Sequence, residues 1–331
     1  MLKSSLRKRR KRQPPGVETK HNNKVTRMTR TSSFLVAFFA SASILAIGGF
    51  NVAEAFGTSV VYGPSTSAIE LVLLTSKLAA KEGQESFSIC GPGQESKYSR
   101  LMYGNDNDET TETDPTMATP ISAPDDMQNA LSKANTLFLV CYDNPIEEKA
   151  LNTLLDNAGS DLSKVVMLSK MGATAGGGGF FGGGSKLLDS ENVVRSQCKS
   201  KNLDLSIVRA GVLKGGGPGQ PAELDYGLSK VYYNTLFELS EATCTMSHDR
   251  FTLGIDCSKG DSVEMPNPIT LFGTKTSFDA YPYDTNRINA AMACVMAAKH
   301  DKPVEFSVGA AKSESLPTAE EWEEVMGKME V

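Results

Sequence analysis

Residues 164–209 read KVVMLSKMGATAGGGGFFGGGSKLLDSENVVRSQCKSKNLDLSIVR, and this stretch decides the fold. It begins with a largely apolar run at 164–168 (KVVML) and ends with a second strand pattern at 204–209 (DLSIVR), with a helical pattern over 187–201 between them. Strands that are apolar at successive positions are buried on both faces, which is typical of parallel sheets covered by helices. The stretch therefore predicts one βαβ unit.

The same alternation continues on both sides of this unit. Further strands are predicted at 58–62, 86–90, 136–141 and 304–308, and further helices at 68–81, 146–158, 222–241, 285–299 and 318–328. Right-handed crossovers between such strands give a doubly wound parallel sheet, so we predict an α/β Rossmann fold. The acidic, turn-rich residues 104–126 predict a solvated insertion. We expect 56–243 to form the core and 244–331 a small C-terminal substrate or partner portion that completes the fold.

Composition separates the chain into two unlike pieces. The 331 residues are 40% hydrophobic and include 6 Cys, which excludes a wholly disordered chain and a disulfide-stapled miniprotein. The net charge of −5 averages a basic leader, residues 1–55, and an acidic remainder. The leader holds 11 Lys/Arg and 2 Asp/Glu, which leaves 23 basic and 37 acidic residues for the rest. An acidic body repels phosphate, so nucleic-acid binding is not expected.

The leader has the organisation of a targeting segment. A basic cluster at 3–12 precedes an apolar run at 34–50, and Ala53-Glu54-Ala55 is an A-x-A site of the kind that signal peptidase cuts. A retained signal anchor, which would contact a membrane, is the alternative to a cleaved signal peptide. Translation from Met28 would give a signal peptide with an ordinary short basic region before its apolar run. The string Ala53-Glu54-Ala55-Phe56 resembles the junction in plastid-targeted proteins of diatoms and related algae, which implies a plastid; the endoplasmic reticulum is the alternative.

Ligands of open parallel sheets bind outside the carboxyl ends of the strands. The first such loop is Gly63-Pro64-Ser65-Thr66-Ser67, between a predicted strand and a predicted helix. Gly63 alone occupies a position of the dinucleotide glycine fingerprint. Ser65, Thr66 and Ser67 either donate hydroxyl groups to phosphate at the helix N-terminus or only cap the helix. The order Gly184-Ser185-Lys186 excludes a P-loop.

Two motifs make the resemblance specific. VVMLSKMGA (165–173) and NLDLSIVRAGVLKGGGPG (202–219) resemble the atypical short-chain dehydrogenase/reductase family, in its NAD(P)-binding branch. The resemblance implies NADP or NAD as cofactor and hydride transfer from NADPH to a bulky carbonyl or conjugated substrate. Taken with the positions of the strand-end loops, the resemblance implies which residues contact the cofactor. These are Gly63, Ser65, Thr66, Ser67, Cys141, Tyr142, Ser169, Arg209, Ala210, Gly211 and Val212.

The choice between the two cofactors depends on the predicted strand at 86–90. At its end stand Cys90-Gly91-Pro92. This end has neither the acid expected to bind the ribose of NAD nor an adjacent Arg for the 2′-phosphate of NADP. Lys97 or Arg100 would reach a 2′-phosphate, and we therefore favour NADP slightly.

The catalytic assignment departs from the family. Ser169 matches the serine that polarises a carbonyl, but the helix before strand 204–209 has no Tyr for the Tyr-x-x-x-Lys pair. Tyr226 and Lys230 have the right spacing but follow that strand, while Lys186 is nearer the expected place of the Lys. A non-catalytic Rossmann scaffold, redox sensor or assembly factor, with a protein partner, is therefore the rival hypothesis.

The remaining chemistry-bearing residues favour structural roles. Cys90, Cys141, Cys198 and Cys294 are expected to be packed thiols, and Cys244 and Cys257 to pair only if oxidised. His248 and His300 lack a ligand pattern, so no metal site is predicted.

Overall fold

A computed structural model describes residues 57–64, 69–104, 117–142, 144–174, 184–215, 228–229, 232, 253–261 and 284–330. All described residues belong to one compact unit of the chain, within Asn51–Val331. The targeting segment and most of the predicted helix 222–241 lie outside the described residues. No helix within these ranges is long and apolar enough to cross a membrane.

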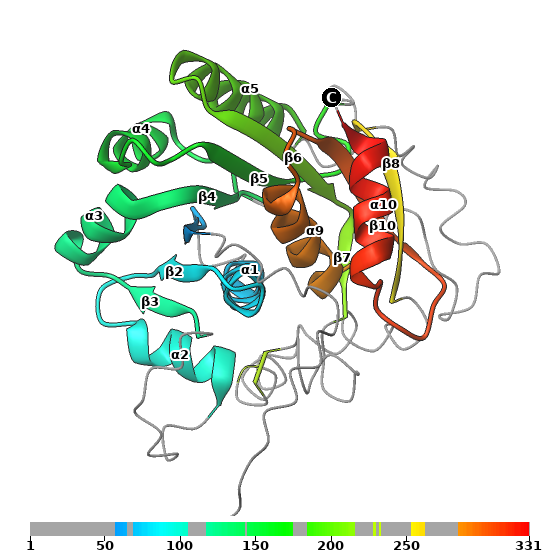
Figure 1. Ribbon diagram of the computed structural model, residues 1–331, viewed down its shortest axis with the longest axis horizontal. Coiled ribbons are helices and arrows are strands. Elements are labelled where there is room, and N and C mark those ends of the chain that lie inside the picture. The colour runs from blue at the N-terminus through cyan, green and yellow to red at the C-terminus, as the bar shows by residue number, and fades with distance from the viewer. Residues whose placement is uncertain are drawn as a thin grey trace, which may run out of the picture. The chain divides into compact units, whose positions relative to one another are not determined.

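One sheet of eight strands organises the described part of the chain (Figure 1). Its order is β3-β2-β1-β4-β5-β6-β10-β8, and all neighbours pair in parallel except β8, which runs antiparallel to β10. The strands are β1 (Thr58–Tyr62), β2 (Glu85–Ile89), β3 (Thr119–Ile121), β4 (Ala134–Val140), β5 (Lys164–Lys170), β6 (Asp204–Ala210), β8 (Gly254–Lys259) and β10 (Glu305–Ala311). The chain leaves β1 for β2 and β3 and then returns to β4, so β1 and β4 mark the point where the strand order reverses. The doubly wound α/β fold is thereby confirmed.

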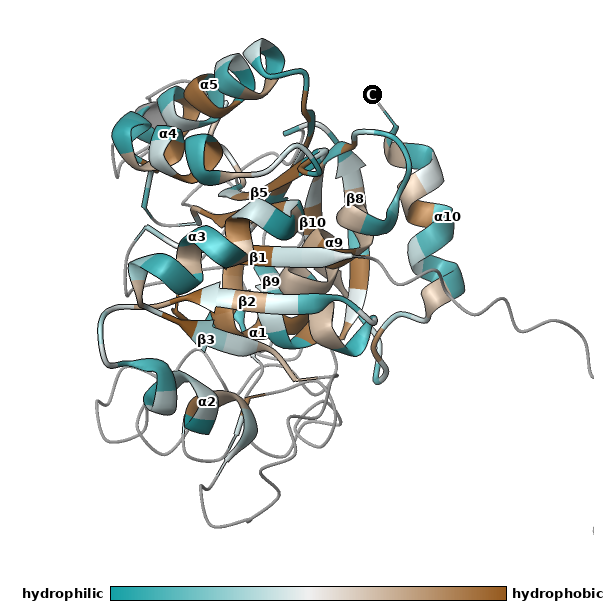
Figure 2. Cartoon of the chain, turned by 60° about the vertical axis from the view of Figure 1, so that its left-hand side comes forward, coloured by the Kyte–Doolittle hydropathy of each residue, from teal (hydrophilic) through white to brown (hydrophobic). Residues whose placement is uncertain are grey.

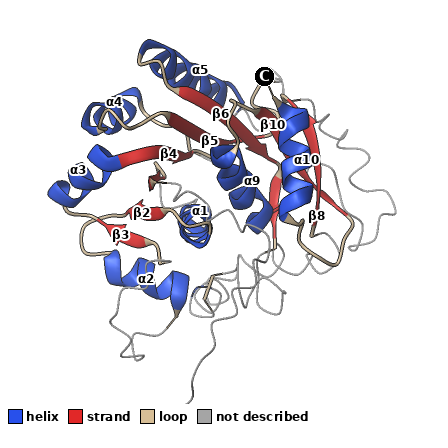
Figure 3. Cartoon of the chain, viewed as in Figure 1, coloured by secondary structure: helices blue, strands red, loops and turns tan. Residues whose placement is uncertain are grey.

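Helices cover both faces of the sheet, as Figure 3 shows. One face carries α1 (Ile69–Lys81), α2 (Glu95–Tyr103), α9 (Arg287–Lys299) and α10 (Ala319–Met329). The other carries α3 (Pro124–Lys133), α4 (Glu148–Asn157) and α5 (Gly184–Ser200). Helices α4 and α5 mix hydrophilic and hydrophobic residues along their length (Figure 2), which is typical of helices that bury one side only.

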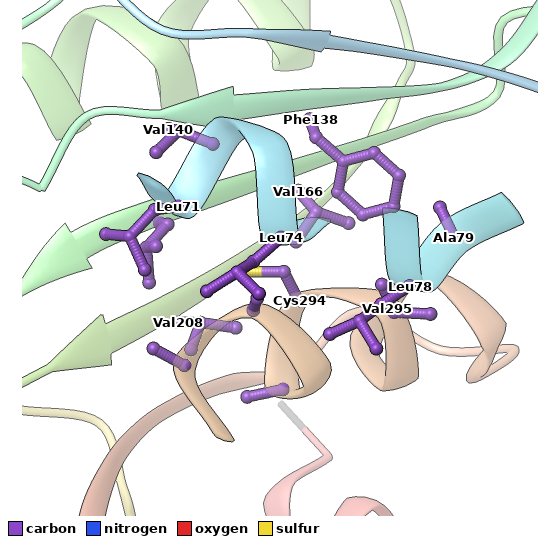
Figure 4. Close-up of a cluster of buried hydrophobic side chains, with 14 of the residues drawn as sticks. Leu71, Leu74, Leu78, Ala79, Phe138, Val140, Val166, Val208, Cys294 and Val295 are labelled. Atoms are coloured by element: carbon purple, nitrogen blue, oxygen red, sulfur yellow. The ribbon is translucent and has the colours of Figure 1, made fainter. Parts of the chain in front are cut away.

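The largest core cluster lies between the sheet and the pair α1 and α9 (Figure 4). Leu71, Leu74 and Leu78 recur at the helical spacing that places them on one side of α1. They meet Cys294 and Val295 of α9 over apolar side chains of the central strands, namely Phe138, Val140, Val166 and Val208. This packing fixes the beginning of α1 above the carboxyl ends of the central strands.

The expected insertion at 104–126 is partly wrong. Residues 105–116 lie outside the described ranges, but Thr119–Ile121 forms β3 and Pro124 begins α3. Pro120 lacks the N–H that a central strand needs, and it is tolerated because β3 is an edge strand. Pro124 suits the first turn of a helix, where its missing N–H is no loss.

The C-terminal part of the chain joins this same sheet. β10 pairs with β6, and β8 closes the edge beyond it. A short parallel pair, β7 (Val212–Lys214) and β9 (Asp284–Asn286), lies just after β6. Consequently the start of α9 also lies near the carboxyl end of β6.

Candidate functional site

The carboxyl ends of β1, β4, β5 and β6 bring predicted site residues together. Gly63 follows β1, Cys141 and Tyr142 follow β4, Ser169 lies at the end of β5, and the segment Arg209–Val212 spans the end of β6. These strands are neighbours in the sheet. The predicted strand-end loops therefore share one edge.

Gly63 is the tightest point of this edge. A Cβ atom added there would lie 2.6 Å from Val72 Cγ2 of α1 and 3.6 Å from the carbonyl oxygen of Val140. Real Cβ atoms do not approach other heavy atoms at 2.6 Å, so any other residue here would force Val72 or α1 to shift. Ser65, Thr66 and Ser67 of the same loop lie outside the described residues.

Tyr142 ties three strand ends to one another. Its hydroxyl donates to the Gly211 carbonyl at 2.5 Å, and the Lys170 ammonium lies 4.9 Å from the centre of its ring. The Gly211 N–H in turn donates to Thr285 Oγ1 at 2.7 Å, and that hydroxyl donates to the Val308 carbonyl. The turn after β6 is thus held from β4 on one side and from β10 on the other.

Other predicted contact residues are buried at this edge. Burial raises the pKa of the Cys141 thiol to about 12, so it is an uncharged core side chain. Ala210 is fully buried, whereas Val212 is one of two large apolar side chains in the described ranges that are exposed, at 42%. Among these residues of the described chain, Val212 is therefore the one exposed apolar side chain.

Ser169 and Arg209 are paired neighbours on β5 and β6, and both are fully buried. Arg209 donates to Glu191 of α5 through Nε at 3.0 Å and Nη2 at 2.6 Å, and to Glu305 at 2.7 Å. Its side chain is committed to these carboxylates, so the predicted cofactor role does not extend to the guanidinium. Ser169 Oγ and Arg209 Nη1 have no hydrogen-bond partner in the described part of the chain.

The charges around Arg209 form a mixed network. Arg195 joins Glu305 at 2.7 Å and Glu191 at 3.7 Å, and Asp261 lies 4.0 Å from Arg209 Nε. Burial alone would raise the pKa of Glu305, but the hydrogen bonds from Arg195 and Arg209 outweigh it, and the pKa is lowered. Glu305 therefore remains ionised at neutral pH.

Asp261 holds the loop that leads out of β5. Its Oδ1 accepts from the Gly172 N–H at 2.8 Å, and its Oδ2 accepts from the N–H and the hydroxyl of Thr174, both at 2.8 Å. Gly172 adopts φ = 81°, which favours glycine. The end of β8 thus positions the residues that follow Ser169.

Replacing Asp261 by alanine is expected to release this loop. The lost hydrogen bonds should cost about 1–3 kcal/mol of local stability, because the donors lose a charged acceptor. Hydrogen–deuterium exchange should then accelerate at Gly172 and Thr174. Asp256→Ala, a change at an exposed position of β8, should leave the exchange at these two residues unaltered. Equal exchange in both variants would contradict this role.

A charged pair lies at the beginning of α1. Glu70 is in the first turn, and its carboxylate lies 3.7 Å from Arg287 Nε. Arg287 also donates to the Gly215 carbonyl at 2.9 Å, and the Tyr232 hydroxyl donates to Glu70 at 3.4 Å. Arg287 offsets the negative charge of Glu70 where α1 faces the strand ends. Sequence reasoning missed Arg287, because only the pairing of β7 with β9 brings α9 to this edge.

Both members of the predicted catalytic pair, Tyr226 and Lys230, lie outside the described residues. Lys186 is an exposed residue in the first turn of α5. Cys90, Cys198 and Cys294 are buried free thiols, as expected. Within the described ranges no cluster of three or more His, Cys, Asp or Glu residues is arranged to hold a metal ion.

No family model and no curated protein matches the chain. Among solved structures, it is similar to a wide-type short-chain dehydrogenase/reductase from Veillonella parvula DSM 2008 in complex with NADP, at TM-score 0.45 and 11% identity, over 79% of this chain and 99% of that one. It is also similar to a UDP-N-acetylglucosamine 4-epimerase from Methanobrevibacter ruminantium M1, at TM-score 0.41 and 13% identity, over 77% of this chain and 78% of that one. A third similar structure is vestitone reductase from alfalfa, Medicago sativa, at TM-score 0.40 and 12% identity, over 75% of this chain and 74% of that one. The fold assignment rests on the strand order, and likenesses this distant carry no functional argument.

Proposed function

We propose that the chain binds a nicotinamide dinucleotide along the carboxyl ends of β1, β4, β5 and β6. The observation that carries the proposal is Gly63, which lies at the point where the strand order reverses and has no room for a Cβ atom. Dinucleotides bind in this crevice of doubly wound sheets, with the pyrophosphate at the N-terminus of the first helix.

The residues present fit such a ligand. The Gly63 loop and the first turn of α1 would hold the pyrophosphate, with Arg287 as the cation that offsets Glu70. The exposed side chain of Val212 would pack on the apolar face of the nicotinamide. A bound dinucleotide would supply hydride for the reduction of a carbonyl or conjugated substrate.

Two functions follow from this binding mode. A reductase would use Ser169 to polarise the substrate, as the resemblance implies. A non-catalytic scaffold or redox sensor is favoured by one observation, because the Ser169 side chain is fully buried. Turnover therefore needs a test separate from binding.

Titration of the full chain with NADH and NADPH, followed by nicotinamide fluorescence, is expected to give a Kd in the micromolar range. Val212→Glu should weaken the binding of NADH and of NADPH by at least about tenfold each, because it adds an anion beside an anionic ligand. Met117→Glu is the matched control, because Met117 is the other exposed large apolar residue in the described ranges and precedes β3.

Absence of NADH and NADPH binding by the unmodified chain would overturn the proposal. Equal affinities of Val212→Glu and Met117→Glu would contradict the proposed packing of Val212 on the nicotinamide. Oxidation of the bound cofactor by aldehydes, ketones or quinones, slowed by Ser169→Ala, would support the reductase. Binding without oxidation would support the scaffold.

A further inference from the structure

Two fully buried polar side chains lie next to each other between the sheet and α5. Ser169 and Arg209 are register partners on the parallel strands β5 and β6, and the exposed fraction of each is 0%. Met167 and Ile207, two residues earlier on the same strands, belong to the core cluster beneath α4 and α5. Side chains two positions apart on a strand share a face, so Ser169 and Arg209 both point toward these helices.

The guanidinium of Arg209 has two unused N–H groups. It carries five N–H donors, of which Nε donates to Glu191 at 3.0 Å, and Nη2 donates to Glu191 at 2.6 Å and to Glu305 at 2.7 Å. The two N–H groups of Nη1 are left, and Nη1 has no hydrogen-bond partner in the described part of the chain. Buried donors of native proteins are almost always paired, so these two N–H groups indicate a bound partner.

Ser169 has the complementary hydrogen-bonding capacity. Its hydroxyl offers one donor and two acceptor sites, and Oγ likewise has no partner among the described residues. The pairing of β5 with β6 places this hydroxyl beside Arg209 on the same face. One molecule that accepts from Nη1 and donates to Oγ would satisfy both side chains at once.

The surrounding charges favour an uncharged molecule. Two arginines and two glutamates form ion pairs here at 2.6–3.7 Å, namely Arg195, Arg209, Glu191 and Glu305. The buried carboxylate of Asp261 adds a further negative charge 4.0 Å from Arg209 Nε. A bound anion would meet these carboxylates, and a bound cation would meet the guanidinium, so the charges oppose either ion.

We infer that this site binds one internal water molecule, which accepts from Arg209 Nη1 and donates to Ser169 Oγ. Water is a small neutral molecule with both capacities, and buried waters typically make about three hydrogen bonds to polar groups that otherwise have no partner. The inference does not depend on dinucleotide binding.

The water makes Ser169 a positioning residue of the buried charge network. Through the water, the end of β5 is joined to Arg209, and Asp261 beside Arg209 holds the loop after β5 at Gly172 and Thr174. A hydroxyl that is held in this way beneath α5 is not the group that polarises a substrate. The inference therefore favours the non-catalytic scaffold over the reductase.

A crystal structure of the full chain that resolves ordered water is expected to show one water between Ser169 and Arg209. Magnetic relaxation dispersion of the water oxygen counts long-lived internal waters in solution, and Ser169→Ala should lower that count by one. Ser206→Ala is the matched control and should leave the count unchanged. Ser206 is a fully buried serine of β6 whose hydroxyl accepts directly from the Val304 N–H at 3.1 Å.

A direct hydrogen bond between Ser169 and Arg209 in the crystal, with no water between them, would overturn the inference. An unchanged count of internal waters in Ser169→Ala would contradict it in solution. Soaking the crystals in bromide tests for an anion in the same place, and an anomalous signal between Ser169 and Arg209 would show that the ligand is charged and overturn the assignment of water.

Discussion

Replacement of Arg209 by methionine is expected to lower the free energy of unfolding by about 3–5 kcal/mol. Arg209 and Glu191 are both fully buried and share two hydrogen bonds, at 3.0 and 2.6 Å. Methionine fills much of the same space but leaves Glu191 as a buried charge without its closest counterion. The loss should appear in urea denaturation as a lower midpoint with an unchanged slope.

Two further variants separate the buried charge from the outer ion pairs. Arg195→Met removes a half-exposed partner of Glu305 and Glu191 and should cost no more than about 1 kcal/mol. The double variant Arg209→Met with Glu191→Leu replaces the pair by apolar side chains and should recover most of the loss. A stability of Arg209→Met within about 1 kcal/mol of the unmodified chain would show that this network does not support the fold.

Arg209 also shows where sequence reasoning reaches its limit. The run at 204–209 correctly predicted a buried strand, because the apolar residues around Arg209 have the composition of one. The function of the arginine was misjudged, because its partners come from α5 and β10, 18 and 96 positions away. Only the packing of these elements reveals that the guanidinium lies within the core.

Strands β1, β2, β4, β5, β6 and β10 followed from local patterns, whereas α2, α3 and the strands β3, β7, β8 and β9 did not. The apolar side chains of α2 at Tyr98, Leu101 and Met102 have helical spacing, but the polar composition of 95–100 and the preceding Gly-Pro-Gly turn concealed it. β3 has three residues and contains Pro120. This missed region supplies Ser122 and Glu95, whose hydrogen bond joins the start of α2 to the end of β3.

Gly63 was predicted to contact the cofactor because it is the one glycine of the dinucleotide fingerprint in its loop. Its contacts with α1 explain why glycine suits this position. Gly63→Ala is expected to cost about 1–3 kcal/mol of stability, because the new methyl group would lie 2.6 Å from Val72 Cγ2. Valine is branched at Cβ and cannot rotate away freely. The first helix would therefore move relative to β1, and the affinity for NADH should fall by at least about tenfold, since the proposed site places the pyrophosphate at that helix terminus.

Val72→Ala provides the matched rescue of Gly63→Ala. It removes the atom that the new Cβ would meet, so the double variant should recover stability and NADH affinity relative to Gly63→Ala alone. The four proteins form a thermodynamic cycle whose interaction energy should be about 0.5–3 kcal/mol in favour of the pair. Additive losses would mean instead that the contact with Val72 is not what requires glycine at this position, since an added Cβ would meet the Val140 carbonyl only at an ordinary 3.6 Å. Rescue of stability without rescue of NADH affinity would place the pyrophosphate away from this turn.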